Sequence, residues 1–77
     1  MEKARDILHA YFKTKTDKPV SDADNLFVAG VLDSIGVLEL VSHLEGSLGI
    51  EIDPDDISEA NFKSIDLIAA LAAAKLQ

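Results

Sequence analysis

The sequence predicts a small all-α bundle of three main helices and one short helix. Apolar residues recur at intervals of three and four in three separate stretches of the chain, which is the spacing of one buried helix face. No stretch shows the alternation of apolar and polar residues that is typical of a half-buried strand. The chain has 77 residues, so residues 1–77 are expected to form a single domain.

The first helix is predicted over roughly residues 2–13. Its apolar stripe, at the spacing i, i+3, i+4, i+7 and i+8, consists of Ala4, Ile7, Leu8, Tyr11 and Phe12. The two aromatic residues are interpreted as core rather than as part of a ligand site. His9 lies off the stripe and is predicted to be on the surface.

A long loop is predicted from Thr14 to Asp33, because turn-forming residues interrupt the helical pattern there. The turn formers are Pro19, Ser21, Asp22, Asp24, Asn25 and Gly30. Apolar residues of the same segment are expected to hold the loop against the bundle. They are Leu26, Phe27, Val28, Val31 and Leu32. Because a loop this long is unusual in a small domain, a functional role is expected for it.

The second main helix is predicted to begin at Ser34, its candidate N-cap, and to end before Gly49. Its predicted buried stripe consists of Val37, Leu40, Val41, Leu44 and Leu48. The side away from the core carries Glu39, Ser42, Glu45 and Gly46. His43 also lies off the stripe, which argues against a buried or metal-binding role for it.

The remainder of the chain is predicted to form an extended segment, a turn and two helices. Ile50 and Ile52 form an extended apolar pair, and a short helical piece is predicted near residues 58–62. Ser64 is the candidate N-cap of a last helix that runs from Ile65 to Leu76. The apolar stripe of this helix consists of Ile65, Ile68, Ala69, Ala72 and Leu76.

The charge of the chain argues against several classes of partner. Seven basic and fourteen acidic residues give a formal net charge of −7, which disfavours DNA, RNA and anionic membranes. Residues 1–18 hold five basic and three acidic groups, but no Lys or Arg occurs between Pro19 and Phe62. That acidic stretch is either a solvated face or a docking surface for basic partners.

The chain contains no cysteine, which excludes disulfides, thiolate metal sites and a thiol nucleophile of its own. No apolar run approaches the length of a membrane span. The start of the chain is interrupted by charges at Glu2, Lys3, Arg5 and Asp6, so no signal peptide is predicted. We therefore expect a soluble, cytoplasmic protein. It is expected to be a monomer, because the apolar stripes of its helices are all needed for the core.

Two kinds of self-contained site do not fit the residues. The acidic clusters are Asp22 with Asp24, and Asp53 with Asp55 and Asp56. Neither cluster has the Gly and Glu positions of a calcium loop, so no metal site is predicted. A serine hydrolase is also rejected, because Ser34 lacks the preceding glycine of a nucleophile elbow and His43 lies more than two turns away. No catalytic residue is predicted.

Ser34 ends a long loop and begins a helix, and the positive N-terminal end of a helix favours an attached phosphate. The string from Phe27 to Leu40, FVAGVLDSIGVLEL, resembles the attachment motif of the acyl carrier protein superfamily. The core of that motif is an Asp-Ser-aliphatic triplet, preceded by a loop and followed by an acidic amphipathic helix. The resemblance covers essentially the whole chain, including a Gly-Ile-x-Ile step at 49–52 and a last helix after the string Asn-Phe-Lys-Ser-Ile at 61–65.

This resemblance implies that Ser34 is esterified with 4′-phosphopantetheine, which a magnesium-dependent phosphopantetheinyl transferase donates from coenzyme A. The thiol of this arm would hold acyl intermediates as thioesters, in agreement with the absence of cysteine. The chain would be a non-catalytic carrier that delivers its cargo to loading ligases, synthases and acyltransferases with basic docking patches. Its implied partner-facing residues are Asp33, Ile35, Glu39, Ser42 and Glu45. An acyl pocket is implied with the lining Leu44, Ile52, Ile57, Phe62, Ile65 and Ala69, for which ordinary core is the alternative interpretation.

The second helix departs from carriers of primary fatty acid synthesis at Gly36, Ser42 and Gly46, where an acid, a Met and a Glu are usual. The pattern Leu-Asp-Ser-x-Gly-x-x-Glu-Leu at 32–40 is closer to D-alanyl carriers and other specialised stand-alone carriers. The resemblance implies a cargo of fatty acid, lipid, envelope or secondary metabolism, with a D-alanyl or aminoacyl carrier as the alternative, and these departures favour a specialised pathway. The two glycines also predict a less rigid second helix.

A second hypothesis is an acidic helical interaction module that carries no prosthetic group. Its binding to a partner would be sensitive to charge reversal at Glu39 and Glu45, but indifferent to replacement of Ser34.

Overall fold

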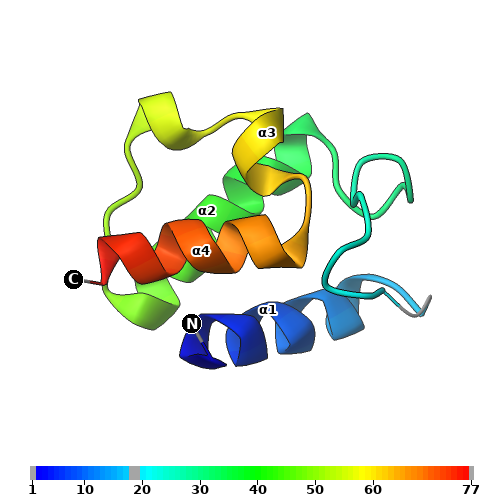
Figure 1. The fold of residues 1–77 in the computed structure, drawn as a ribbon, viewed down its shortest axis with the longest axis horizontal. Helices are drawn as coiled ribbons and strands as arrows, with labels where there is room; N and C mark the ends of the chain where they lie inside the picture. The colour runs from blue at the N-terminus through cyan, green and yellow to red at the C-terminus, as the bar shows by residue number, and fades with distance from the viewer. Residues whose placement is uncertain (1, 18–19, 77) are drawn as a thin grey trace.

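The computed structural model describes residues 2–17 and 20–76. All regular secondary structure in these residues is helical. The elements are α1 (Glu2–Lys15), α2 (Ser34–Leu48), the 3₁₀ turn η1 (Pro54–Asp56), α3 (Glu59–Phe62) and α4 (Ile65–Lys75). In Figure 1, α1 and α4 lie side by side, α2 passes behind α4, and η1 and α3 lie on the opposite side of α4 from α1. The predicted fold class is confirmed, with η1 as an additional turn. No described helix has the length and apolar character that a membrane crossing requires.

One hydrophobic core is shared by the long helices, α3 and the loop before α2. Its largest fully buried side chains are Phe62, Leu8, Leu26, Leu40, Leu44, Ile65 and Ile68. All five predicted stripe residues of α2 are buried, and in α1 the stripe residues Ile7 and Tyr11 pack at the edge of the core. Leu76 is an exception to its predicted stripe, with 44% of its surface exposed, because α4 ends at Lys75 and Leu76 forms the C-cap.

The loop before α2 is held to the bundle by two buried leucines, Leu26 and Leu32. The backbone N–H of Leu26 donates to the carbonyl oxygen of Lys63 at 2.7 Å, which ties the loop to the segment between α3 and α4. The expectation that every apolar loop residue faces the bundle is wrong for Val28, which is 83% exposed. Val28 lies within a tight turn whose start is capped by the Asn25 side chain, and this turn directs it outward. The predicted turn former at Pro19 lies outside the described residues.

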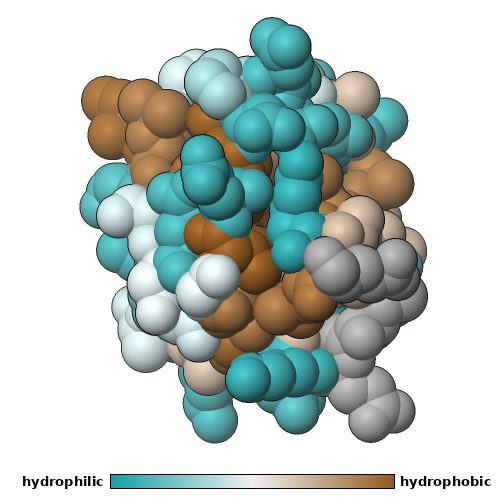
Figure 2. All heavy atoms as spheres, turned by 90° about the vertical axis from the view of Figure 1, so that its left-hand side faces the viewer, coloured by the Kyte–Doolittle hydropathy of each residue, from teal (hydrophilic) through white to brown (hydrophobic). Residues whose placement is uncertain are grey.

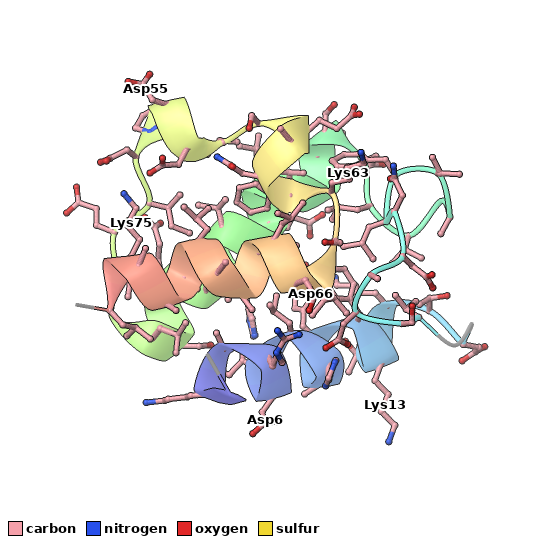
Figure 3. The ribbon with its side chains drawn as sticks, viewed as in Figure 1. Asp6, Lys13, Asp55, Lys63, Asp66 and Lys75 are labelled. Carbon is pink, nitrogen blue, oxygen red and sulfur yellow. The ribbon has the colours of Figure 1, made fainter. Side chains whose placement is uncertain are left out.

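An ionic cluster joins the same loop to α1 and to the beginning of α4. Nη1 of Arg5 donates to Oδ2 of Asp22 at 2.6 Å and also to the carboxylate of Asp66. His9 is exposed, as predicted. It is also paired, because its Nε2 lies 2.6 Å from Oδ1 of Asp22. The hydrogen bonds from His9 and Arg5 lower the pKa of Asp22. Figure 3 shows Asp66 at the start of α4, on the side of α1.

At the other end of α4, Lys75 holds the segment around η1. Its Nζ lies 2.6 Å from Oδ2 of Asp56 and 3.2 Å from Oδ2 of Asp53. These two carboxylates raise the pKa of Lys75, Asp56 more strongly than Asp53. Figure 3 shows Asp55, the third member of this acidic cluster, at the outer edge of η1. Figure 2 looks onto this end of the bundle, where hydrophobic atoms form an uneven band between hydrophilic ones.

Candidate functional site

Ser34 is the first residue of α2, and it is exposed. The N-cap of α2 is Asp33, so the prediction of Ser34 as the cap is wrong. Oδ1 of Asp33 accepts a hydrogen bond from the backbone N–H of Gly36 at 2.7 Å. Aspartate caps a helix as well as serine does, and the extended backbone of Asp33 (φ −134°, ψ −176°) is the conformation that an N-cap requires. The hydroxyl of Ser34 is therefore not used to cap the helix.

The first turn of α2 suits an anionic group attached at Ser34. Backbone amides at a helix N-terminus lack intrahelical acceptors and carry partial positive charge. The amides of Gly36 and Val37 donate to Asp33, whereas those of Ser34 and Ile35 have no acceptor among residues 2–17 and 20–76. A phosphodiester on the Ser34 oxygen would lie at this positive end of the helix, so the residues fit a phosphate-linked prosthetic group.

Gly36 is closely packed against the cap. A Cβ atom added there would lie 3.1 Å from Oδ1 of Asp33 and 3.2 Å from Cδ1 of Leu32. Both distances are shorter than ordinary van der Waals contact. The glycine at this position, noted above as a departure from carriers of primary fatty acid synthesis, therefore gives room to the capping carboxylate.

The exposed face of α2 beside Ser34 is partly apolar. Ile35 is 70% exposed and Leu38 is 59% exposed, and the predicted partner residues Glu39 and Ser42 are exposed as well. Leu38 is absent from the residues expected to face partners. Its position three residues after Ile35, on the same helix face, is the signal that could have identified it.

Glu45 differs from the other residues predicted to face partners. It is half-buried, and its Oε2 accepts a hydrogen bond from the backbone N–H of Ile52 at 3.0 Å. This contact joins α2 to the extended segment that follows it. Glu45 therefore has a structural role that its position on the polar side of the helix does not reveal.

The residues predicted to line an acyl pocket are part of the closed core. Leu44, Ile52, Phe62, Ile65 and Ala69 are at most 5% exposed, and Ile57 packs at the edge of the core. The structure thus brings the six residues together, in the arrangement of an ordinary core. Two surface hollows lie elsewhere, along α1. The larger, of about 670 Å³, lies beside His9, Lys13 and Asp22, and Ile65 is the one predicted lining residue that borders it.

The smaller hollow, of about 190 Å³, lies beside the start of α2. Its lining consists of Tyr11, Phe12 and Lys15 from α1, residues 30–33 from the loop, and Gly36 and Glu39 from α2. Nζ of Lys15 lies 5.2 Å from the centroid of the Tyr11 ring, and the ring of His43 lies 4.8 Å from the same ring, centroid to centroid. Tyr11 is therefore held in place by residues of both helices.

The described residues hold no group of three or more His, Cys, Asp or Glu side chains that could bind a metal ion. Both histidines contact other side chains, because His9 pairs with Asp22 and the ring of His43 lies against that of Tyr11. The site at Ser34 thus consists of an exposed hydroxyl, a capped helix end and a neighbouring hollow.

Residues 3–72 match the model of a protein family described as a phosphopantetheine attachment site. No curated protein and no solved structure gives a significant match to the chain. The matched range contains Ser34 and extends from α1 into the last turns of α4. The resemblance identified from the sequence is confirmed by this match.

Proposed function

The chain belongs to the phosphopantetheine attachment site family, whose prosthetic group is a covalent 4′-phosphopantetheine, and on this premise we propose that Ser34 carries that group. The observation that carries the proposal is the first turn of α2. There the Ser34 hydroxyl is exposed at the positive helix end, while the neighbouring Asp33 provides the cap. Capping and attachment are thus assigned to different side chains.

The proposed protein is a single-domain acyl carrier without catalytic activity of its own. When bound, the prosthetic group supplies a thiol, which this cysteine-free chain lacks, and the thiol holds acyl intermediates as thioesters for delivery to partner enzymes. We place the carrier in the cytoplasm, in fatty acid, lipid, envelope or secondary metabolism. The residues Leu44, Ile52, Ile57, Phe62, Ile65 and Ala69 remain the proposed lining for a cargo that enters the bundle, which requires this core to open.

The proposed docking surface for partner enzymes is the exposed face of α2. It comprises Asp33, Ile35, Glu39, Ser42 and Glu45, now with Leu38 added. The surface combines exposed apolar side chains with carboxylates in a stretch without Lys or Arg. A phosphopantetheinyl transferase or an acyl-loading enzyme with a basic patch would be steered to it by charge. Among the acids, Asp33 and Glu45 accept hydrogen bonds from backbone amides, whereas Glu39 is exposed and makes no such contact with the described residues.

The test of this proposal is the intact mass of the protein after incubation with coenzyme A and a broad-specificity phosphopantetheinyl transferase. We expect one phosphopantetheine on the unaltered chain and none on Ser34→Ala, with peptide fragmentation locating the group. Ser47→Ala is the matched control, because Ser47 is an exposed serine in the same helix, and it should be modified in full.

Modification of Ser34→Ala would contradict the assignment. An unmodified native chain, beside a known carrier that is modified in the same reaction, would favour the acidic interaction module. A pull-down would then be expected to recover a partner whose binding is weakened by Glu39→Lys but not by Ser34→Ala.

A further inference from the structure

The hollow between α1 and α2 is lined by residues that precede and follow Ser34 in the chain. Asp33, which precedes Ser34, and Gly36, which follows two positions later, both contribute to its lining. Ser34 itself does not line the hollow, so a group on its oxygen has to pass Asp33 or Gly36 to enter it. The larger hollow, beside His9 and Asp22, does not include the neighbours of Ser34.

The lining of this hollow is chemically mixed. Lys15 brings an ammonium group, Glu39 a carboxylate and Tyr11 an aromatic ring with a hydroxyl. Lys15 is notable because no Lys or Arg occurs between Pro19 and Phe62, so the positive charge comes to this acidic region from α1. A phosphodiester requires a cation or N–H donors, and amide groups require both donors and acceptors.

We propose that Tyr11, Lys15 and Glu39 bind the phosphopantetheine arm along the hollow between α1 and α2 when no partner enzyme is present. This inference rests on the proposed attachment at Ser34. Lys15 attracts the phosphodiester, Glu39 accepts a hydrogen bond from an amide N–H of the arm, and the Tyr11 ring provides a surface for its methylene and methyl groups. At about 190 Å³, the hollow is below the roughly 300–1,000 Å³ of pockets that enclose a drug-sized ligand, so it holds part of the arm.

Binding on this side leaves the apolar part of the docking surface accessible, whereas Asp33 and Glu39 belong both to that surface and to the lining of the hollow. Gly36, Glu39 and His43 recur at i, i+3 and i+7, and they contribute to the hollow or contact Tyr11 of α1. The exposed residues Ile35, Leu38 and Ser42 recur with the same spacing on a neighbouring face of α2. A partner can therefore contact Ile35, Leu38 and Ser42 while the arm is still bound, and then withdraw the arm from the hollow.

The test uses the holo-protein, with the polypeptide labelled with ¹³C and ¹⁵N and the arm unlabelled. Isotope-filtered NOE spectra report contacts between arm protons and protein protons directly. We expect NOEs from the arm to the ring protons of Tyr11 and to the side chain of Lys15. We also expect amide shift differences between holo and apo protein at residues 30–33.

The matched variants are Lys15→Gln and Lys13→Gln, which remove the same charge from the same helix. Lys13 borders the other hollow, and Figure 3 shows its side chain directed away from the bundle. Removal of an exposed ionic contact should weaken binding of the arm in Lys15→Gln by about 1.4- to fivefold, because such a contact contributes about 0.2–1 kcal/mol, and the arm NOEs should weaken accordingly. The same NOEs should be unchanged in Lys13→Gln.

Intact mass separates failure of this inference from failure of the proposed function, because it reports attachment whatever the position of the arm. A modified protein without NOEs to Tyr11 and Lys15, or with arm NOEs to α3 instead, would overturn the proposed arm site. Equal weakening of the NOEs in the two lysine variants would overturn it as well.

Discussion

Replacement of Asp33 by alanine tests whether this residue, rather than Ser34, caps α2. The variant removes the acceptor of the 2.7 Å hydrogen bond from the Gly36 amide. Loss of an N-cap costs about 1 kcal/mol, and loss of a carboxylate at a helix N-terminus costs about 0.3–1 kcal/mol more. The free energy of unfolding of Asp33→Ala should therefore fall by about 1–2 kcal/mol. For a domain of this size, each kcal/mol lowers Tm by about 4–8 °C.

Urea unfolding followed by circular dichroism at the helical band measures this loss, with two variants for comparison. Asp33→Asn keeps a capping oxygen and loses only the charge, so its unfolding free energy should fall by about 0.3–1 kcal/mol. Ser34→Ala alters an exposed residue that makes no cap bond, so it should remain within about 0.5 kcal/mol of the native chain. A loss in Ser34→Ala as large as that in Asp33→Ala would refute the assignment of the cap.

Two further predictions concern glycine and pH. Gly49 adopts a left-handed backbone (φ 65°), so Gly49→Ala should lower the free energy of unfolding by about 1–2 kcal/mol. Gly46 lies inside α2, with open space where a methyl group would be added. Gly46→Ala should therefore raise the free energy of unfolding by up to about 1 kcal/mol. Urea titrations that gave both changes the same sign would contradict this account. Because the folded-state pKa of Asp22 is lowered, its contribution to stability is present above its ordinary pKa of 3.8 and is lost as the pH falls through the lower folded-state value. Acid titrations of the unfolding free energy should thus show a shallower decline below pH 3.8 in Asp22→Asn, and an unchanged profile would argue against the pairing with His9 and Arg5.

The helices could be predicted because their signals are local. The apolar stripe of α2 and the stop at Gly49 predict its bounds, and Ser64 accepts a hydrogen bond from the Leu67 amide, as expected of the cap of α4. The choice between Asp33 and Ser34 could not be predicted, because both residue types are strong N-caps. The loop backbone, anchored by the buried Leu32, decides between them.

The parts of the site that depend on contacts between residues far apart in the sequence could not be predicted from sequence patterns either. The bond between Glu45 and the Ile52 amide depends on the path of the chain after α2. The hollow beside the start of α2 depends on how the last turns of α1 pack against α2, where the rings of Tyr11 and His43 are in contact. Helical periodicity assigns residues to a face, but it does not say which residues of another element that face meets.

The tight fit at Gly36 has a consequence for how this carrier can change. An added Cβ would require Asp33 or Leu32 to shift by a few tenths of an ångström, so positions 33 and 36 are not independent. Evolution can replace Gly36 by a larger residue only together with an adjustment of the cap, a form of epistasis across Ser34. Efforts to graft the recognition residues of another carrier onto this helix should exchange both positions as a pair.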